Sequence, residues 1–345
     1  MAEVALSKNE PAIWFPAVRA GTGADVFTKL LVAGLRARGI RAEITWLPHR
    51  AEYAPWTVPV PKPPAWANVV HINSWLHRRF HPKNLPIITT VHHCVQDPGL
   101  RRYKSLLQRL YHSTWITPME RHSIHTAAKV VADSAYTSAQ LSKFFALDSA
   151  YVIYPSIDTS EFTPPLARAI HKPFRLLYVG TWSSRKGSDL ISPIMQSLGS
   201  AFELQYTGQP HEVYLKKLPS NCKRIVPART KKELVAIYQQ ADALLFPSRL
   251  EGFGLVAVEA QACGLPVIAT KGSSLLEVVE DKNTGILCEM NNVRHFADAA
   301  RALATDHELW KSMSHSAREH AVSSFAASTF IDDHIKIYCA TLGNA

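Results

Sequence analysis

The feature that most constrains the fold is a regular alternation of short apolar runs with segments of helical periodicity. In the first half, five runs are typical of buried strands: AIWF, ITWL, NVVHI, PIITTV and KVVADS. A helix expected between the first two runs, and ended by Gly39, has its apolar residues on one face: Val26, Phe27, Leu30, Leu31 and Leu35. Continuous Val, Ile and Leu strands separated by helices predict parallel sheets covered on both faces.

The second half repeats this pattern. Its expected strands are FRLLYVG, FELQYTG, KRIVP, ALLFP and PVIAT, and its expected helices are SDLISPIMQSL, KKELVAIYQQA and GLVAVEAQAC. A stretch rich in Pro, Ser and Thr, YPSIDTSEFTPPLARAIHKPF, separates the halves. We therefore expect two doubly wound α/β domains, residues 1–162 and 170–324, that bind ligands in a cleft at the carboxyl ends of both sheets. A last helix, residues 325–345, has no strand after it.

Composition excludes several classes of protein. The chain is 47% hydrophobic and 19% charged, which is typical of a globular protein and not of a disordered one. No apolar run is long enough to span a membrane, and the N-terminus lacks the pattern of a signal peptide. The five cysteines are scattered and never form C-x-x-C, so we expect no disulfide framework, no metal cluster and a cytoplasmic location.

The positive charge is uneven along the chain. Residues 1–160 hold 18 Lys and Arg against 10 Asp and Glu, a balance of +8 out of the total of +10. This excess suits a polyanion, a phosphorylated substrate or an anionic membrane surface. A generally basic protein without such a partner gives the same balance.

Three loops that follow expected strands have the composition of anion-binding loops. In the first, AGTGADVF, Gly21 and Gly23 allow close approach of a ligand to the backbone just before a helix. Val26 stands where the dinucleotide fingerprint requires its third glycine, so a tight turn explains this loop equally well.

In the second loop, VGTWSSRKGSDL, a strand ends at Gly180, and Arg185 and Lys186 can together neutralise a diphosphate. Adjacent cations on a loop are otherwise merely solvated.

The third loop leads into the segment EGFGLVAVE. Glu251 precedes a helix expected to run from Gly254 to Cys263, and Glu259 lies more than one turn inside it. The backbone N–H groups of Phe253, Gly254 and Leu255 can bind phosphate or hydroxyl oxygens at the helix N-terminus. A carboxylate inside an apolar helix is costly unless it is hydrogen-bonded, although Glu259 can also simply face solvent.

These residues resemble glycosyltransferase family 4, whose members are retaining enzymes with the GT-B fold. EGFGLVAVE followed by A-x-A-C-G-L-P-V-I-A-T is similar to the family's nucleotide-sugar motif. Supporting segments occur in the same order: G-T-G, V-V-A-D-S-A-Y-T-S, Y-P-S-I-D-T-S-E-F-T-P and Y-V-G-T-W-S-S-R-K-G. The resemblance implies two Rossmann-like domains facing a central cleft, with the last helix crossing back onto the N-terminal domain. The N-terminal domain would bind the acceptor and the C-terminal domain the nucleotide sugar.

The resemblance also implies roles for individual residues. Glu259 matches the ligand of the ribose hydroxyls, and Glu251 matches a glutamate near the donor sugar. Arg185 and Lys186 match the pair that binds the diphosphate, which makes a divalent metal unnecessary. Phe253 to Leu255, with the glycines named above, complete the substrate-binding set.

Two adjacent histidines, His92 and His93, follow the fourth expected strand in the sequence H-H-C-V-Q-D. The family often has a histidine here that reaches the donor sugar and is commonly followed by aspartate. This chain lacks that neighbour, and Asp97 comes later. We assign His92 to the family position and keep His93 as the alternative; a structural pair of histidines is a third explanation.

The function implied is transfer of a hexose from a UDP- or GDP-linked sugar to a hydroxyl of a saccharide or lipid-linked saccharide. Family habit favours bacterial lipopolysaccharide, O-antigen or another surface glycan as the product. No cofactor and no nucleic-acid partner is expected. A non-catalytic binder of nucleotide sugars or polyanions is the alternative.

Two other enzyme classes are disfavoured. An NAD-dependent oxidoreductase would need an acidic residue at the end of the second strand, where the chain has Trp46-Leu47-Pro48-His49. Glycoside hydrolysis would not need the phosphate-binding loops.

Residues 100–116 predict a basic amphipathic helix. Its apolar residues recur at helical spacing: Leu100, Tyr103, Leu107, Leu110 and Tyr111. Such a helix can lie on an anionic bilayer at the inner face of the cell membrane, or its apolar face can pack on its own sheet. We favour packing. The proline-rich residues 54–66 either shape an acceptor pocket or form an extended connector.

Overall fold

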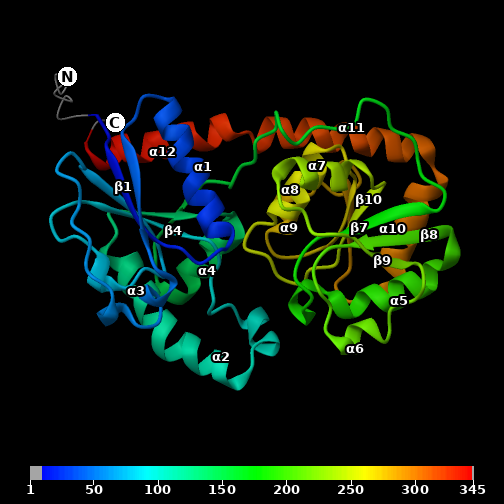
Figure 1. Ribbon diagram of the computed structural model, residues 1–345, viewed down its shortest axis with the longest axis horizontal. Helices are drawn as coiled ribbons and strands as arrows, with labels where there is room; N and C mark the ends of the chain where they lie inside the picture. The colour runs from blue at the N-terminus through cyan, green and yellow to red at the C-terminus, as the bar shows by residue number, and fades with distance from the viewer. Residues whose placement is uncertain (1–9, 344–345) are drawn as a thin grey trace. The chain divides into compact units, whose positions relative to one another are not determined.

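The computed structural model describes residues 10–343 and divides the chain into two compact units (Figure 1). The first unit consists of residues up to Pro155 together with those from Ala327 onward, and the second is Ser156–Ala326. Each unit contains one six-stranded sheet in which every pair of neighbouring strands is parallel. This confirms the predicted α/β class with two doubly wound parallel sheets.

The sheet of the first unit has the strand order β2-β1-β3-β4-β5-β6. Its strands are β1 Ile13–Val18, β2 Ala42–Leu47, β3 Val69–Asn73, β4 Ile87–Val91, β5 Lys129–Ala132 and β6 Tyr151–Val152. The first five coincide with the predicted apolar runs. The sixth was not predicted, because two exposed residues at a sheet edge produce no apolar pattern.

The helices of the first unit are α1 Gly23–Ala37, α2 Leu106–Tyr111, α3 Thr117–Thr126, α4 Ala135–Phe145 and α12 Ala327–Thr341. Helix α1 buries Phe27, Leu31 and Leu35 as predicted, but Val26 is 57% exposed, so its place on the apolar face was wrong. Each residue turns a helix by about 100°, which rotates Val26 away from the sheet. Helix α12 packs on α1 so closely that a Cβ at Gly34 would lie 2.3 Å from the Ile331 side chain.

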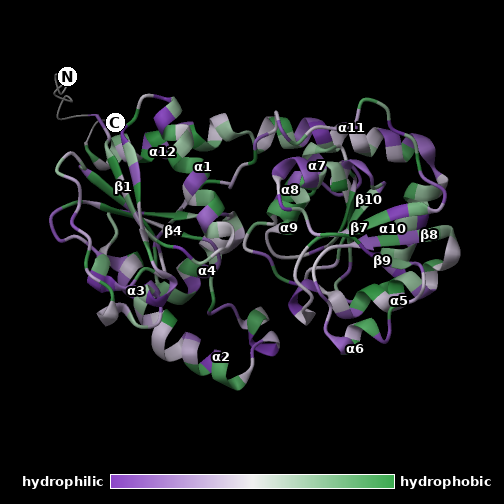
Figure 2. Ribbon diagram, in the orientation of Figure 1, coloured by the Kyte–Doolittle hydropathy of each residue, from purple (hydrophilic) through white to green (hydrophobic). Residues whose placement is uncertain are grey.

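The sheet of the second unit has the order β12-β11-β10-β7-β8-β9. Its strands are β7 Phe174–Tyr178, β8 Phe202–Tyr206, β9 Cys222–Arg224, β10 Ala243–Phe246, β11 Val267–Thr270 and β12 Gly285–Cys288. Its helices are α5 Ser188–Leu198, α6 Glu212–Leu215, α7 Lys231–Gln239, α8 Leu255–Ala262, α9 Leu275–Val278, α10 Val293–Thr305 and α11 His307–Ser324. Figure 2 shows apolar residues concentrated in the central strands of both sheets, around β4 and β10.

The boundary between the units lies earlier than predicted. Residues 156–162, which were predicted to belong to the first domain, are fixed to the second unit by hydrogen bonds. Ile157 forms a bridge with Ala326, and the Arg318 guanidinium on α11 donates to the carbonyl oxygens of Thr159 at 3.0 Å and Phe162 at 2.6 Å. These long-range contacts leave no periodic signal in the sequence.

The predicted helix at residues 100–116 is in fact three short elements. A 3-10 helix, Pro98–Tyr103, precedes α2, and a π-helical turn, His112–Ile116, joins α2 to α3. No residue of α2 is buried: Leu106, Leu107 and Leu110 are 78%, 79% and 60% exposed. The favoured interpretation, an apolar face packed on its own sheet, was therefore wrong for α2.

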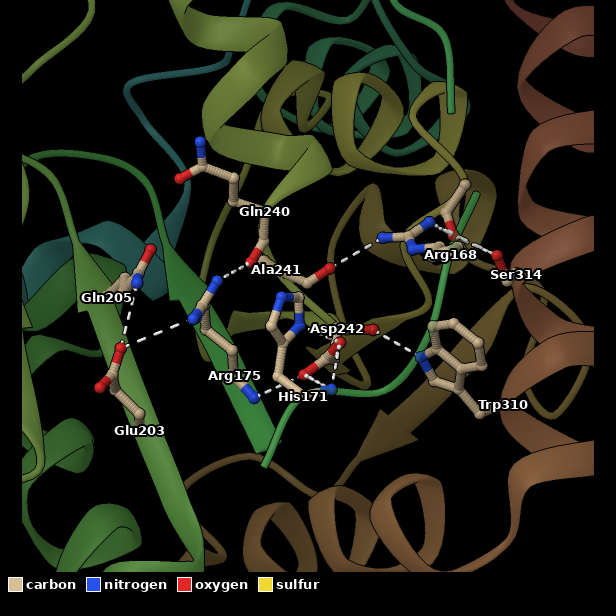
Figure 3. A network of polar contacts seen from close by, with 11 residues as sticks. Arg168, His171, Arg175, Glu203, Gln205, Gln240, Ala241, Asp242, Trp310 and Ser314 are labelled. Atoms are coloured by element: carbon tan, nitrogen blue, oxygen red, sulfur yellow. Dashed lines mark hydrogen bonds and ion pairs between the residues drawn. The ribbon is translucent and has the colours of Figure 1, made fainter. Parts of the chain in front are cut away.

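A network of polar contacts around the buried Asp242 joins the start of the second unit to the amino-terminal ends of its strands (Figure 3). The carboxylate of Asp242, which precedes β10, accepts hydrogen bonds from the backbone N–H groups of His171 and Arg175, the latter at 2.7 Å. The ring of His171 bonds the same carboxylate at 2.8 Å, and Trp310 on α11 donates to the Asp242 carbonyl. Because ligands of parallel α/β sheets bind at the carboxyl ends of the strands, this network is structural.

Candidate active site

Two loops at the carboxyl edge of the second sheet bring together an arginine, a lysine and a glutamate. Lys186 and Arg185 lie after β7, and Glu251 lies after β10. The Lys186 ammonium is 2.6 Å from Oε1 of Glu251, and Arg185 Nη1 is 3.9 Å from its Oε2. The Glu251 side chain is buried, and burial by itself would raise its pKa. The two cations outweigh burial, so the pKa of Glu251 lies below its ordinary value.

The loop that carries the two cations is held in place by local geometry. Ser183 caps the 3-10 turn Ser184–Lys186 through a hydrogen bond from the Lys186 N–H to its Oγ. Gly187 ends this turn with a φ of +70°, and a Cβ there would lie 2.1 Å from the carbonyl oxygen of Pro247. Only glycine permits this close approach of the β7 loop to the β10 loop.

Arg249, which no sequence motif indicated, connects the same loops. Its guanidinium forms a fork with the Asp189 carboxylate at 2.6 and 2.7 Å, and its Nε donates to the side chain of Asn291. Its backbone N–H also donates to the carbonyl oxygen of Arg185 at 2.9 Å. A bidentate arginine fixes geometry as well as charge, so Arg249 positions the Arg185 loop.

Helix α8 begins beside this cluster, as predicted. Gly254 has a φ of +112°, and a Cβ there would approach the Leu275 side chain to 3.0 Å. The hydroxyl of Ser274 donates to the carbonyl oxygens of Glu251 and Phe253, which fixes the turn. The Phe253 ring is buried against Phe325, so this residue contributes backbone to the site. Leu255 begins the helix, and the Ala257 N–H donates to the Gly254 carbonyl oxygen at 2.8 Å, which closes the first turn.

Glu259 lies on α8 and is partly buried. The hydroxyl of Tyr238, on α7, donates a hydrogen bond of 2.7 Å to its Oε2. Burial raises the pKa of Glu259 to about 7, although the Tyr238 hydrogen bond acts to lower it. This carboxylate is therefore held in place. The alternative that Glu259 simply faces solvent does not fit this hydrogen bond. Tyr238 was missed because it lies 21 residues away on another helix.

The glycine at the end of the FRLLYVG strand also lies at this edge. Gly180 has a φ of +144°, and its N–H donates to the Thr207 hydroxyl at 3.3 Å. A Cβ at Gly180 would meet no atom within 4 Å. The glycine is thus required by its backbone conformation and leaves the space beside it open.

In the first unit, backbone amides of the glycine loop before α1 already bind a carboxylate of the chain itself. The Asp25 carboxylate accepts hydrogen bonds from the N–H groups of Ala20 at 3.3 Å and Gly21 at 2.9 Å. Gly21 has a φ of +71°, whereas a side chain at Gly23 would meet no atom within 4 Å. Two of the amides that could have bound a phosphate are therefore engaged by the chain itself. This finding favours the alternative of a tight turn at Gly21.

The two histidines after β4 have different surroundings. His92 Nδ1 lies 2.8 Å from Oδ2 of Asp133, the residue that follows β5. His93 instead packs its ring against Trp75 at a centroid distance of 5.5 Å. Asp97, the later acid of H-H-C-V-Q-D, accepts from the Gly99 N–H and the Tyr136 hydroxyl. The carboxylate that pairs with His92 is therefore that of Asp133, at the end of the neighbouring strand β5.

The described residues contain no cluster of three or more His, Cys, Asp or Glu side chains that could hold a metal ion. Within residues 10–343, every helix is too short or too polar to cross a bilayer.

Two sequence models of glycosyltransferases match adjacent parts of the chain. The model described as Glycosyltransferase Family 4 matches residues 65–161, and the one described as Glycosyl transferases group 1 matches residues 165–320. The chain belongs to glycosyltransferase family 4. The second match contains the whole cluster of Arg185, Lys186, Glu251 and Glu259, and the first contains His92 and Asp133.

Relatives with known names are similar to part of this chain. A D-inositol 3-phosphate glycosyltransferase of Pseudarthrobacter chlorophenolicus is 30% identical over 209 residues, which cover 54% of this chain and 50% of that protein. A D-inositol 3-phosphate glycosyltransferase of Catenulispora acidiphila is 31% identical over 242 residues, which cover 62% of this chain and 58% of that protein. This chain thus spans about half the length of these relatives.

Solved structures share the fold at low sequence identity. A sucrose-phosphate synthase from Thermosynechococcus elongatus has a TM-score of 0.79 at 17% identity, covering 97% of this chain and all of that one. HepE of Anabaena in complex with UDP and glucose has a TM-score of 0.72 at 16% identity, covering 96% and 100%. WaaG, a glycosyltransferase involved in lipopolysaccharide biosynthesis, has a TM-score of 0.71 at 18% identity, covering 94% and 99%. These likenesses show the GT-B fold with its Rossmann-like domains.

Proposed function

We propose that this chain transfers a hexose from a nucleoside diphosphate sugar, linked to UDP or GDP, to a hydroxyl of an acceptor. The observation that carries the proposal is the grouping of Arg185, Lys186 and Glu251 beside the N-terminus of α8, with Glu259 held by Tyr238 farther along that helix. Two cations at a helix N-terminus suit a diphosphate, and a fixed carboxylate suits a pair of hydroxyls.

Each part of the donor has a matching group in the second unit. Arg185 and Lys186 bind the diphosphate, and Glu259 accepts hydrogen bonds from the ribose hydroxyls. Glu251 accepts from a hydroxyl of the sugar once the phosphate oxygens share Lys186 with it. The solved complexes of HepE with UDP support this assignment by analogy of fold.

The reaction retains the configuration of the anomeric carbon. The bond between that carbon and the diphosphate oxygen breaks, and a bond to the acceptor oxygen forms on the same face. The acceptor's proton passes to the departing diphosphate oxygen, so atoms and charges balance. Arg185 and Lys186 stabilise the negative charge that develops on the leaving group, which is the task that a divalent ion performs elsewhere. Activity therefore persists when metals are chelated.

The acceptor we propose is a saccharide or a lipid-linked saccharide of a bacterial surface glycan. The role of WaaG in lipopolysaccharide biosynthesis supports this choice. The named inositol phosphate enzymes make a phosphorylated polyol a second acceptor class to include in any screen. The balance of +8 over residues 1–160 is favourable to either kind of anionic acceptor.

The test is a panel of UDP- and GDP-linked hexoses combined with these acceptors, with products identified by mass spectrometry. We expect one donor to give an acceptor heavier by one hexose, and its anomeric configuration by NMR to match the donor. Tight binding of the donor without any product across the panel would favour the alternative, a non-catalytic binder. Stabilisation by NAD and not by UDP or GDP would contradict the proposal.

We also propose that α2 contacts an anionic membrane surface from the cytoplasmic side. Leu106, Leu107 and Leu110 are exposed together, and Arg101 and Arg102 beside them are exposed too. The sequence contains no Asp or Glu between residues 98 and 119. Exposed leucines next to unneutralised arginines are the composition of an interfacial segment.

Sedimentation with lipid vesicles tests the membrane contact. We expect binding to vesicles that contain phosphatidylglycerol, weaker binding to neutral vesicles, and loss of most binding in Leu107→Ser. The matched control is Leu276→Ser, since Leu276 is 53% exposed on α9 of the other unit. Equal binding by both variants would show that α2 is not the contact.

A further inference from the structure

His92 and Asp133 occupy equivalent positions on two adjacent strands. Strands β4 and β5 are parallel neighbours, and their last paired residues are Val91 and Ala132. His92 directly follows Val91, and Asp133 directly follows Ala132. The register of the two strands therefore places these residues side by side at the carboxyl edge. Their side chains meet at 2.8 Å between Nδ1 and Oδ2.

We propose that Asp133 is a positioning residue that fixes the orientation and the tautomer of His92, so that Nε2 is the ring atom offered to the substrate. This inference rests on the proposed function together with the family resemblance, which implies that the histidine at the His92 position reaches the donor sugar. It concerns a residue that the sequence motif of the histidine does not include, since the neighbours of His92 are His93 and Cys94.

The Asp133 carboxylate is committed to this task. Its side chain is 7% exposed, and its other oxygen, Oδ1, is buried without a hydrogen bond from the described residues. Within residues 10–343, the ring of His92 is thus the hydrogen-bond partner that the structure shows for the Asp133 side chain. A buried carboxylate with one partner is costly, and such a cost is expected where the pair has a function.

A second contact holds the plane of the His92 ring. Phe27 on α1 meets it edge to face, with a centroid distance of 4.9 Å and an interplanar angle of 75°. Phe27 is itself buried against Phe330 on α12. The imidazole is therefore held by a carboxylate at one nitrogen and by an aromatic ring at its side, and Nε2 has no hydrogen-bond partner within the described residues.

The electrostatics favour a protonated ring. Burial acts to lower the pKa of His92, but the charge and hydrogen bond of Asp133 outweigh it, so the pKa lies above its ordinary value. Two nearby histidines shift the other way: burial lowers the pKa of His71 well below its usual range and that of His334 to about 4. Without Asp133, burial alone would govern His92 and its pKa would fall.

The chemical consequence concerns a hydrogen bond to the substrate. When Nδ1–H is bound to a carboxylate, the neutral ring presents an acceptor at Nε2, and the protonated ring presents a donor there. An imidazolium donor suits an anionic or hydroxyl oxygen of the donor sugar. Replacing the carboxylate with an amide lets the side chain donate to Nδ1, which selects the opposite tautomer.

The experiment combines kinetics with histidine NMR of the full chain. In wild type we expect ¹⁵N shifts of a His92 protonated at Nδ1, assigned by its absence from His92→Gln. In Asp133→Asn we expect a lower His92 pKa and a kcat lowered about 10- to 100-fold, with the donor KM within about twofold. Asp133→Glu, which keeps the charge, restores part of kcat, and Asp148→Asn, an exposed control, changes neither readout.

A double variant separates positioning from a general structural role. His92→Gln with Asp133→Asn should be no slower than His92→Gln alone, because the carboxylate acts only through the ring. Additive losses, or a His92 titration unchanged in Asp133→Asn, would overturn the inference. If no donor supports transfer, the NMR result still decides the role of Asp133, so the two proposals fail separately.

Discussion

Lys186 and Glu251 form an ion pair of 2.6 Å between two loops that are 65 residues apart in the sequence. Arg185 lies on the other oxygen of the same carboxylate, so one negative charge holds two positive ones at the mouth of α8. A diphosphate that binds here must share both cations with Glu251. Under the proposed function, we therefore expect the pair to tune affinity for the nucleotide.

Glu251→Gln should separate binding from transfer. Without the carboxylate the two cations are free for phosphate, so we expect the Kd for UDP or GDP to fall by up to about tenfold, roughly 1.4 kcal/mol. The transfer rate should fall at least about tenfold, because the contact with the donor sugar is lost. Calorimetry and initial rates measure both effects. Glu308→Gln, an exposed site on α11, is the control. Weaker nucleotide binding in Glu251→Gln would contradict this account.

Donor affinity should depend on pH through Glu259. Its pKa in the folded chain is about 7, above the ordinary 4.5. Between pH 4.5 and 7 the unfolded chain has lost this proton and the folded chain still holds it, so folding stability falls as the pH rises through this range. Ribose hydroxyls bind the ionised carboxylate, so affinity should change in the opposite sense. A UDP-sugar should bind about tenfold more tightly at pH 8 than at pH 6.

Two variants check the origin of that pH dependence. Glu259→Gln should bind weakly and show a flat profile between pH 6 and 8. Tyr238→Phe removes the hydrogen bond that lowers the pKa of Glu259, so its midpoint should move to higher pH. Identical profiles in wild type and Glu259→Gln would assign the titration to another group.

The glycine at the end of the Arg185 loop offers a matched pair of substitutions. Gly187 and Gly199 have nearly the same φ, +70° and +69°, but ψ is 20° at Gly187 and −162° at Gly199, so alanine is strained at both positions and more strongly at Gly199. At Gly187 the new Cβ would also strike the Pro247 carbonyl oxygen, whereas at Gly199 it would meet nothing within 4 Å. We expect Gly187→Ala to weaken nucleotide binding at least tenfold and Gly199→Ala to leave it unchanged. Equal binding by both variants would show that the loop contact is not required.

How far the sequence predicts this molecule can be judged from particular elements. The strands were predictable because a parallel sheet buried on both faces demands continuous apolar runs such as PIITTV and ALLFP. The loop positions of Arg185, Lys186 and Glu251 followed from those strands. Strand β12, GILC, was missed because it has only four residues and the first of them is a glycine, which leaves too short an apolar run to show a period.

Contacts between distant segments were not predictable. The bond of Tyr238 to Glu259, the fork of Arg249 on Asp189, and Asp133 beside His92 all depend on register and helix packing. Periodicity also misjudged α2, because an apolar spacing shows which residues share a face and not whether that face is covered.

The network in Figure 3 predicts a loss of stability without a loss of binding. Asp242 is fully buried and accepts from two backbone N–H groups and the His171 ring. Asp242→Ala should lower the free energy of unfolding by about 3 kcal/mol, because it leaves these donors unpaired. Nucleotide affinity measured below the melting range should stay within about twofold. The control is Asp298→Asn, which removes an exposed ion pair with Arg301 on α10 and should lower the free energy of unfolding by less than about 1 kcal/mol. A smaller loss for Asp242→Ala than for Asp298→Asn in chemical denaturation would refute the structural role.

The most direct test of the donor site is calorimetric titration of UDP and GDP into wild type, Arg185→Ala and Glu259→Ala. Arg185 and Glu259 contact different parts of the proposed ligand, so each substitution should weaken binding of the same nucleotide at least tenfold while leaving the melting temperature nearly unchanged. Binding in wild type that is at least tenfold weaker in both variants is the predicted result. Wild-type affinity in either variant, with the fold intact, would contradict the assignment of this site to a nucleoside diphosphate sugar.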